Sequence, residues 1–385
     1  MSPNLANNFL IKRFERAFVG ESLDFAILHT IHPKSASKTR TSPTPKTLYI
    51  LDSSFNPPTR AHLSLAISAL RNPLPSYPGP YRLLLLLATH NAEKKPAPAS
   101  DAERLEMMVR FAEDLRELYP EETQEIVIDV GATTMPYYTD KSEAIVRAGS
   151  MEERATNVEV GSDELPKSAE SLVIQDAVPS IMNRIEKLKL SQAEDTSATE
   201  PTHRSDDPST ATLHIKPSTT YTKSSRQLLP TYGTARHLHL LGFDTLTRFL
   251  APKYYTNHKP PLSALAPFFE SGHGLICTQR AESSSDMKVE EGCESTEAQE
   301  QYLKGLKEGE KVEEWERQGW KKEWAKQVVM VPAEKAAVGV SSSVVRKAVK
   351  ANRWEEVEEM CTNRVVEYVK KHNPYAEDGK GAKLA

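Results

Sequence analysis

The sequence predicts an α/β protein with a doubly wound parallel sheet that is interrupted by polar, partly disordered inserts. Strand-sized apolar runs, such as residues 48–51 and 81–88, alternate along the chain with helical patterns such as 101–118. Strands that alternate with helices are typical of parallel sheets. The alternation stops at about 150–219 and 281–301, where the composition turns polar and charged. A mean hydropathy of −0.52 over 385 residues fits a smaller core that carries such inserts.

Each expected element follows from its own local pattern. Phe9, Phe14 and Phe18 recur at roughly helical spacing and predict a short amphipathic helix over 5–18, followed by a Ser/Thr/Pro/Lys linker over 33–46. The apolar periodicity then predicts, in chain order, strand 48–51, helix 59–70, strand 81–88, helix 101–118, strands 125–130, 235–241, 274–279 and 328–331, and a closing helix within 365–375.

These elements group into three parts of the chain. We expect an N-terminal helix and linker over 1–46 and a single domain over 47–374, which contains both inserts. A polar tail over 375–385 follows. The first insert carries one helical pattern, at 177–190, and is otherwise rich in Ser, Thr, Glu and Asp, a composition that cannot bury enough apolar surface to fold alone.

Charge and cysteine content exclude several classes of protein. A formal net charge of −4 gives no general attraction to nucleic acid or acidic membranes, so neither is expected as a partner. The longest apolar run is strand-sized, far below the ~20 residues that span a bilayer. Three cysteines without metal-ligand spacing indicate free thiols in a reducing compartment. We therefore expect a cytoplasmic or nuclear protein.

The most informative stretch is LYILDSSFNPPTRAHL, residues 48–63. Its apolar strand breaks at small, turn-forming residues and resumes as a helix for which Thr59 is a suitable N-cap. His62 then lies in the first helical turn, beside unpaired backbone N–H groups and the positive end of the helix dipole. A lone histidine on a helix is usually structural. In this setting, however, it indicates an anion site.

A second stretch, VSSSVVR, has the same character. Ser341, Ser342 and Ser343 stand between a strand and a helix, and Arg346 lies three residues beyond, on the same helical face as Ser343. Alone, this reads as an ordinary capped helix with a solvated arginine. Both stretches follow strands, and in a parallel sheet such turns meet at the edge where ligands bind.

Together these stretches resemble the nicotinamide and nicotinate mononucleotide adenylyltransferases of the T/H-x-G-H nucleotidyltransferase superfamily, as a divergent, fungal-type member with long inserts. The family's first motif, G-S-F-N-P followed by T/H-x-x-H, matches here at Ser54, Phe55, Asn56, Pro57, Thr59 and His62. VSSSVVR resembles its second motif, I-S-S-T-x-x-R. Gly242 and Asp244, with Phe249, resemble its G-x-D-x-x-x-x-F segment, and Lys94 and Lys95 its lysine loop.

The resemblance implies a Rossmann-like sheet of the nucleotidyltransferase type and transfer of AMP from ATP to the mononucleotide, with pyrophosphate released. It implies that His62 donates to oxygens of the α- and β-phosphates and that Thr59 helps to anchor these phosphates. It also implies that Arg346 and the turn formed by Ser341, Ser342 and Ser343 hold the β- and γ-phosphates. Further ATP contacts fall to Ser54, Phe55, Gly242 and Asp244, and Lys94 or Lys95 would hold a substrate phosphate. Magnesium would be held mainly by ATP oxygens and water, with no metal ligands from the protein.

Two departures from the family pattern concern the acceptor nucleotide. Ser53 stands where the family has a glycine, at a place where the backbone approaches the substrate closely. The family's nicotinamide-stacking tryptophan is absent, and the corresponding stretch offers only Tyr137 and Tyr138, whose rings are smaller.

Two other functions stay open at this point. One is an adenylyltransferase that acts on another phosphorylated acceptor. The other is a nucleotide-binding regulatory protein with residual ATP hydrolysis, whose protein partners dock on the inserts. The sequence contains neither a Walker A motif nor G-x-G-x-x-G, which argues against a P-loop ATPase and a dehydrogenase.

Overall fold

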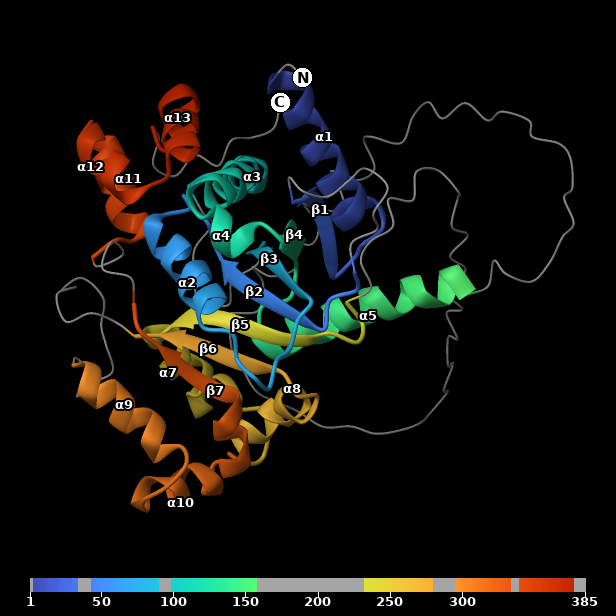
Figure 1. Ribbon diagram of the computed structural model, residues 1–385, viewed down its shortest axis with the longest axis vertical. Coiled ribbons are helices and arrows are strands. Elements are labelled where there is room, and N and C mark those ends of the chain that lie inside the picture. The colour runs from blue at the N-terminus through green and yellow to red at the C-terminus, as the bar shows by residue number, and fades with distance from the viewer. Residues whose placement is uncertain are drawn as a thin grey trace, which may run out of the picture. The chain divides into compact units, whose positions relative to one another are not determined.

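A seven-stranded sheet organises the protein (Figure 1), and its strands follow the order β1-β4-β3-β2-β5-β6-β7. All neighbouring pairs are parallel except β1 with β4. The predicted α/β fold with a parallel sheet is therefore confirmed. The strands are β1 Phe25–Ile31, β2 Thr47–Ser53, β3 Tyr81–Ala88, β4 Val127–Thr133, β5 Arg236–Gly242, β6 Gly274–Thr278 and β7 Val328–Val331.

The computed structural model describes residues 3–33, 43–89, 98–157, 232–279, 295–333 and 339–376. These residues belong to a unit that comprises Met1–Val158 and Leu228–Ala385. No helix among them is long and apolar enough to cross a membrane.

Strands near the middle of the sheet are apolar on both faces because helices cover both. In β2, Tyr49 and Leu51 pack into the core on one face, while Leu48 and Ile50 pack into the core on the other. All four are at most 1% exposed. A continuous apolar run is what a parallel strand buried on both sides requires.

Two helical layers enclose the sheet (Figure 1). The first consists of α1 Pro3–Glu15, α2 Arg60–Arg71, α3 Asp101–Leu118, α11 Ser342–Lys350, α12 Trp354–Met360 and α13 Asn363–His372, with buried side chains in one shared core. The other face is covered by α5 Tyr138–Asn157, α7 Phe243–Phe249 and α8 Ala266–Glu270. The described residues also form the α-helices α4 Pro120–Thr123, α9 Thr296–Gly305 and α10 Glu310–Arg317.

The strand order places a topological switch point between β2 and β5. From β2 the chain moves to β3 and β4 on one side, and it then returns to β5 on the other side of β2. Loops that leave the carboxyl ends of two such strands diverge to opposite faces and leave a crevice, where ligands bind in open α/β sheets.

The N-terminal part contains a strand that the sequence analysis did not predict. β1 pairs antiparallel with β4, and Phe25 lies opposite Thr133. The segment before residue 46 therefore adds an edge strand to the predicted helix. Of the predicted linker, residues 34–42 lie outside the described residues.

The expected boundaries of the inserts and the tail also differ from those observed. α5 runs to Asn157, past the expected start of the first insert at about 150; residues 158–231, with the helical pattern at 177–190, lie outside the described residues. α9 begins at Thr296, inside the second expected insert, because Ser295 caps it by accepting from Ala298 N–H at 3.2 Å. Tyr375 is fully buried, so the core reaches into the expected tail.

The described residues include two of the three cysteines. Cys277 and Cys361 are free, as expected; both are also buried, which raises the pKa of both thiols. Cys293 lies outside the described residues.

Candidate functional site

His62 lies at the switch point, in the first turn of α2 just beyond the carboxyl end of β2. Thr59 caps this helix with an extended backbone, and His62 takes the reciprocal place in the capping box. The backbone N–H of Thr59 donates to Nδ1 of His62 at 3.0 Å, and Oγ1 of Thr59 lies 2.9 Å from the same nitrogen. Because Nδ1 accepts from a backbone N–H, the hydrogen of the neutral ring is assigned to Nε2.

Thr59 is fully buried, and its polar atoms contact His62. The sequence analysis gave this side chain a share in anchoring phosphate. In this structure it holds the imidazole in one tautomer and one orientation.

Ser53, the last residue of β2, contacts the other side of the imidazole. Its Oγ lies 2.8 Å from Nε2 of His62. The residue that replaces the family's glycine therefore interacts with the nitrogen that the resemblance directs toward phosphate.

Phe55 packs against the imidazole of His62. It is fully buried, and its ring centroid lies 5.0 Å from that of His62. Its backbone has φ 44°, a left-handed conformation that costs a non-glycine residue about 1–2 kcal/mol. Burial of the phenyl ring offsets this cost and holds the loop in the turn that leads to α2.

The second motif contacts the first directly. Nη1 of Arg346 donates to the carbonyl oxygen of Asn56 at 2.6 Å, and Oγ of Ser342 donates to that of Pro57 at 2.8 Å. Ser341 is the N-cap of α11 and accepts from the N–H of Val344 at 3.3 Å. The start of α11 thus lies beside the start of α2, as Figure 1 also shows.

Further contacts complete the geometry of the loop. Ser343 is exposed, and its Oγ accepts from Nη2 of Arg346 at 3.2 Å. Arg104, a buried residue of α3, donates to the carbonyl oxygen of Ser54 at 3.3 Å. Side chains from α3 and α11 therefore hold the carbonyl groups of the first motif, and the positive ends of two helix dipoles meet at one loop. Such an arrangement favours a phosphate group.

The other strand of the switch point contributes Gly242 and Asp244. Gly242 ends β5 and is the N-cap of α7, and Asp244 lies in the first turn of that helix. A Cβ atom added at position 242 would meet no atom of the described residues within 4 Å apart from those of its chain neighbours. The structure therefore leaves open space at the carboxyl end of β5, next to β2.

A buried ion pair joins Asp52 of β2 to Lys141 of α5, and the sequence analysis missed it. Both side chains are 5% exposed. The ammonium group of Lys141 lies 5.1 Å from the ring centroid of Tyr138. Asp52 directly precedes the first motif, and only the fold brings Lys141, 89 residues away, next to it.

The two candidate stacking tyrosines differ in their surroundings. The ring of Tyr138 packs edge-on against His239 and Phe249, at centroid distances of 5.2 and 5.6 Å, and burial raises the pKa of its hydroxyl. Tyr137 is 40% exposed. Of the two, Tyr137 has the ring surface available for a ligand.

Three histidines are buried in β5 and just before β6, and the sequence analysis singled out none of them. Nδ1 of His273 accepts from the backbone N–H of His237 at 3.0 Å, and the two rings stack at 4.2 Å. Nε2 of His239 lies 2.8 Å from Oγ of Ser142. Burial lowers the pKa of all three, that of His273 to about 4. They are therefore neutral and structural at ordinary pH.

Two remaining expectations concern lysines and metals. Lys94 and Lys95 lie outside the described residues. Within the described ranges, no three His, Cys, Asp or Glu side chains gather as metal ligands would.

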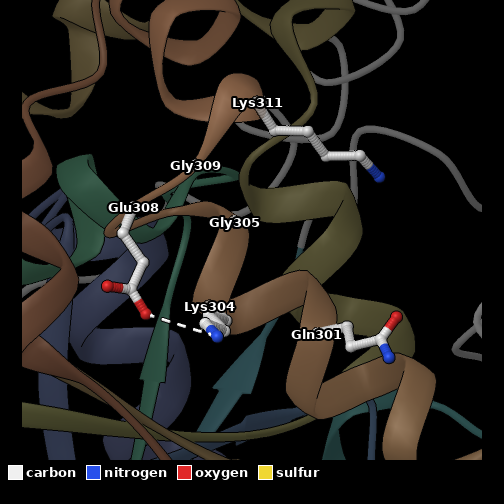
Figure 2. A pocket seen from close by; sticks show the side chains of 6 residues that line it. All are labelled: Gln301, Lys304, Gly305, Glu308, Gly309 and Lys311. Carbon is white, nitrogen blue, oxygen red and sulfur yellow. Dashed lines mark ion pairs between the residues drawn. The ribbon is translucent and has the colours of Figure 1, made fainter.

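A surface hollow of about 550 Å³ lies apart from both motifs, around α9 and the start of α10 (Figure 2). Lys304 and Glu308 form an exposed ion pair there at 3.7 Å. The other lining residues are Gln301, Gly305, Gly309 and Lys311. An exposed pair of this kind contributes little energy, and none of these residues belongs to either motif.

The comparison with curated proteins yields a relative from Schizosaccharomyces pombe (strain 972 / ATCC 24843). It is described as "Putative nicotinamide mononucleotide adenylyltransferase" and is 46% identical over 66 residues. These residues make up 17% of this chain and 23% of the relative, so the match spans about a quarter of the relative's length. No family model matches the chain. The match and the parallel sheet confirm the predicted resemblance to the nucleotidyltransferase family, at the level of one segment and the fold.

Proposed function

We propose that this protein transfers AMP from ATP to nicotinamide or nicotinate mononucleotide, giving NAD or its deamido form and pyrophosphate. One observation carries the proposal: the two phosphate motifs, 290 residues apart at Asn56 and Arg346, are hydrogen-bonded to each other at the switch point of the sheet. The similar S. pombe protein, described as a putative nicotinamide mononucleotide adenylyltransferase, supports the proposal.

In this reaction, a phosphate oxygen of the mononucleotide attacks the α-phosphorus of ATP, and the bond to the β-phosphate bridging oxygen breaks. The chain supplies position and charge, and no covalent intermediate is needed. Arg346 and the starts of α2 and α11 would neutralise the charge that develops on the phosphates. His62, held by Thr59, would keep its Nε2–H in a fixed direction at the phosphate loop. Magnesium would bind phosphate oxygens and water, which requires no carboxylate cluster on the protein.

The decisive experiment supplies the full chain with ATP, magnesium and a panel of mononucleotides. Chromatography would follow the dinucleotide, and a coupled assay would follow pyrophosphate. We expect one pyrophosphate per dinucleotide with a pyridine mononucleotide. A dinucleotide from a different acceptor would keep the enzyme class and change its substrate.

A second candidate function is a nucleotide-binding regulatory protein with residual ATP hydrolysis and protein partners on its inserts. The buried Asp52–Lys141 pair favours it, because the pair makes a closed, charged contact beside Tyr138, one of the two tyrosines that could replace the family's stacking tryptophan. Release of inorganic phosphate without any dinucleotide, across the whole panel, would support this function against transferase activity.

A further inference from the structure

The structure connects three residues into a directed chain of hydrogen bonds. It starts at the backbone N–H of Thr59, which donates to Nδ1 of His62 at 3.0 Å. It continues from Nε2 of His62, which carries the ring hydrogen, to Oγ of Ser53 at 2.8 Å. A hydroxyl group that accepts one hydrogen bond still has its own hydrogen to donate.

Ser53 is also the most exposed of the three residues in this series of hydrogen bonds. Thr59 is fully buried and His62 is 9% exposed, whereas Ser53 is half-buried. Its backbone is fixed in β2, where it pairs with Leu87 of β3. The hydroxyl group therefore has little freedom beyond rotation about χ1.

The imidazole itself cannot readily turn away from Ser53. Thr59 engages Nδ1, and the ring of Phe55 packs against the imidazole with 32° between the two planes. The single hydrogen on Nε2 cannot serve both Ser53 and a phosphate fully. A ligand that contacts the Ser53 hydroxyl needs to break none of these bonds.

From this geometry we infer that Ser53 is the residue that donates to the nucleotide phosphate, at the end of a relay from Thr59 through His62. His62 then acts as a positioning residue that polarises the serine hydroxyl, since successive hydrogen bonds strengthen one another. The inference rests on the proposed function, because it assumes that a nucleotide binds at this loop. It assigns a role to the serine that replaces the family's glycine.

The test measures equilibrium binding of ATP, adenosine and inorganic tripolyphosphate to the full chain by calorimetry. Ser53→Ala and Ser53→Gly should each weaken binding of ATP and tripolyphosphate by about tenfold, as loss of a hydrogen bond to a charged group does. Adenosine binding should not change, because it has no phosphate. Ser53→Thr, which keeps the hydroxyl group, should restore ATP binding.

Two controls separate the relay from a structural effect. Ser76→Ala removes an exposed serine outside both motifs and should bind like the wild type. In a double-mutant cycle, His62→Ala should cost much less in the Ser53→Ala background than alone, because both changes interrupt the same relay.

The outcomes are distinguishable from those for the proposed function. Ser53→Gly that binds ATP as tightly as the wild type, or more tightly, would overturn the relay and show that Ser53 only obstructs His62. Additive effects in the cycle would also overturn it. A wild type that binds ATP but transfers AMP to no acceptor would overturn the proposed function, while the Ser53 variants would still decide the relay. Absence of ATP binding to the wild type would overturn both.

Discussion

Two polar clusters in this protein are built on opposite principles. The first, which we call the Asp129 cluster, joins Asp129 to Arg82, Tyr232 and Thr30. Asp129 is fully buried, and its carboxylate accepts from Thr30 at 2.6 Å, from Nη2 of Arg82 at 3.0 Å and from Tyr232. Every bond joins side chains to one buried charge.

The second, the motif loop of Ser53 to His62, uses its polar partners differently. Arg346, Ser342 and Arg104 donate to backbone carbonyl groups and leave the loop partly exposed. The Asp129 cluster meets its own hydrogen-bonding needs, whereas the motif loop is where we propose that a nucleotide binds. The difference teaches that burial with complete pairing serves stability, while a backbone held by side chains from other helices, with partly exposed polar groups at its edge, suits a ligand.

The largest expected loss of stability comes from a substitution that disrupts the Asp129 cluster. Asp129→Ala leaves the guanidinium of Arg82, 4% exposed, without its carboxylate. Removing one partner of a buried ion pair typically costs about 3–5 kcal/mol of unfolding free energy. Urea denaturation would measure it. Thr30→Val, which removes one neutral donor, should cost only about 1 kcal/mol. Equal losses in the two variants would contradict the central role of the charge.

The next prediction applies the same logic to the motif loop. His62→Ala should lower turnover by at least about 100-fold, as loss of one preorganised donor does. Its melting temperature should stay close to that of the wild type, because the loop is also held by Arg346 and Ser342. If turnover were unchanged, His62 would have no part in the reaction. If His62→Ala lost as much stability as Asp129→Ala, the motif loop would serve stability in the same way as the Asp129 cluster.

A third prediction concerns a buried polar group with a lowered pKa. Burial lowers the pKa of His273 to about 4, while the unfolded chain takes up the proton near pH 6.5. The unfolded state therefore binds more protons between pH 6.5 and 4, and stability falls as the pH drops through this window. His273→Asn should flatten the slope of unfolding free energy against pH by up to one proton. An unchanged slope would show that His273 takes up its proton at the same pH in both states.

The smallest expected effect concerns the two tyrosines that could stack on the mononucleotide. Tyr137→Ala should raise the Michaelis constant for the mononucleotide about tenfold, with ATP affinity unchanged, because stacking on an aromatic ring is worth roughly 1–3 kcal/mol in nucleic-acid complexes. Tyr138→Ala should instead lower the melting temperature, since its ring packs on His239 and Phe249. Normal use of the mononucleotide by both variants would rule out stacking at this place.

Much of the fold could be predicted from the sequence, because strands and helices with a strong apolar pattern are determined by residues that lie close together along the chain. The strand at 81–88 and the helix at 101–118 are observed at the same bounds. Both have a strong apolar pattern, and Ser100 caps the helix through a capping box with Glu103. β1 escaped prediction because its place depends on pairing with β4, about 100 residues away, which no window along the chain contains.

The candidate site divides in the same way between sequence and tertiary structure. The sequence by itself determined the two motifs, the N-caps Thr59 and Ser341, and the likeness of one segment to a mononucleotide adenylyltransferase. Tertiary structure alone decided that Arg346 meets Asn56 and that Lys141 meets Asp52. Helix caps are set by neighbours along the chain. Contacts across the sheet exist only once strand order has brought distant loops to one edge.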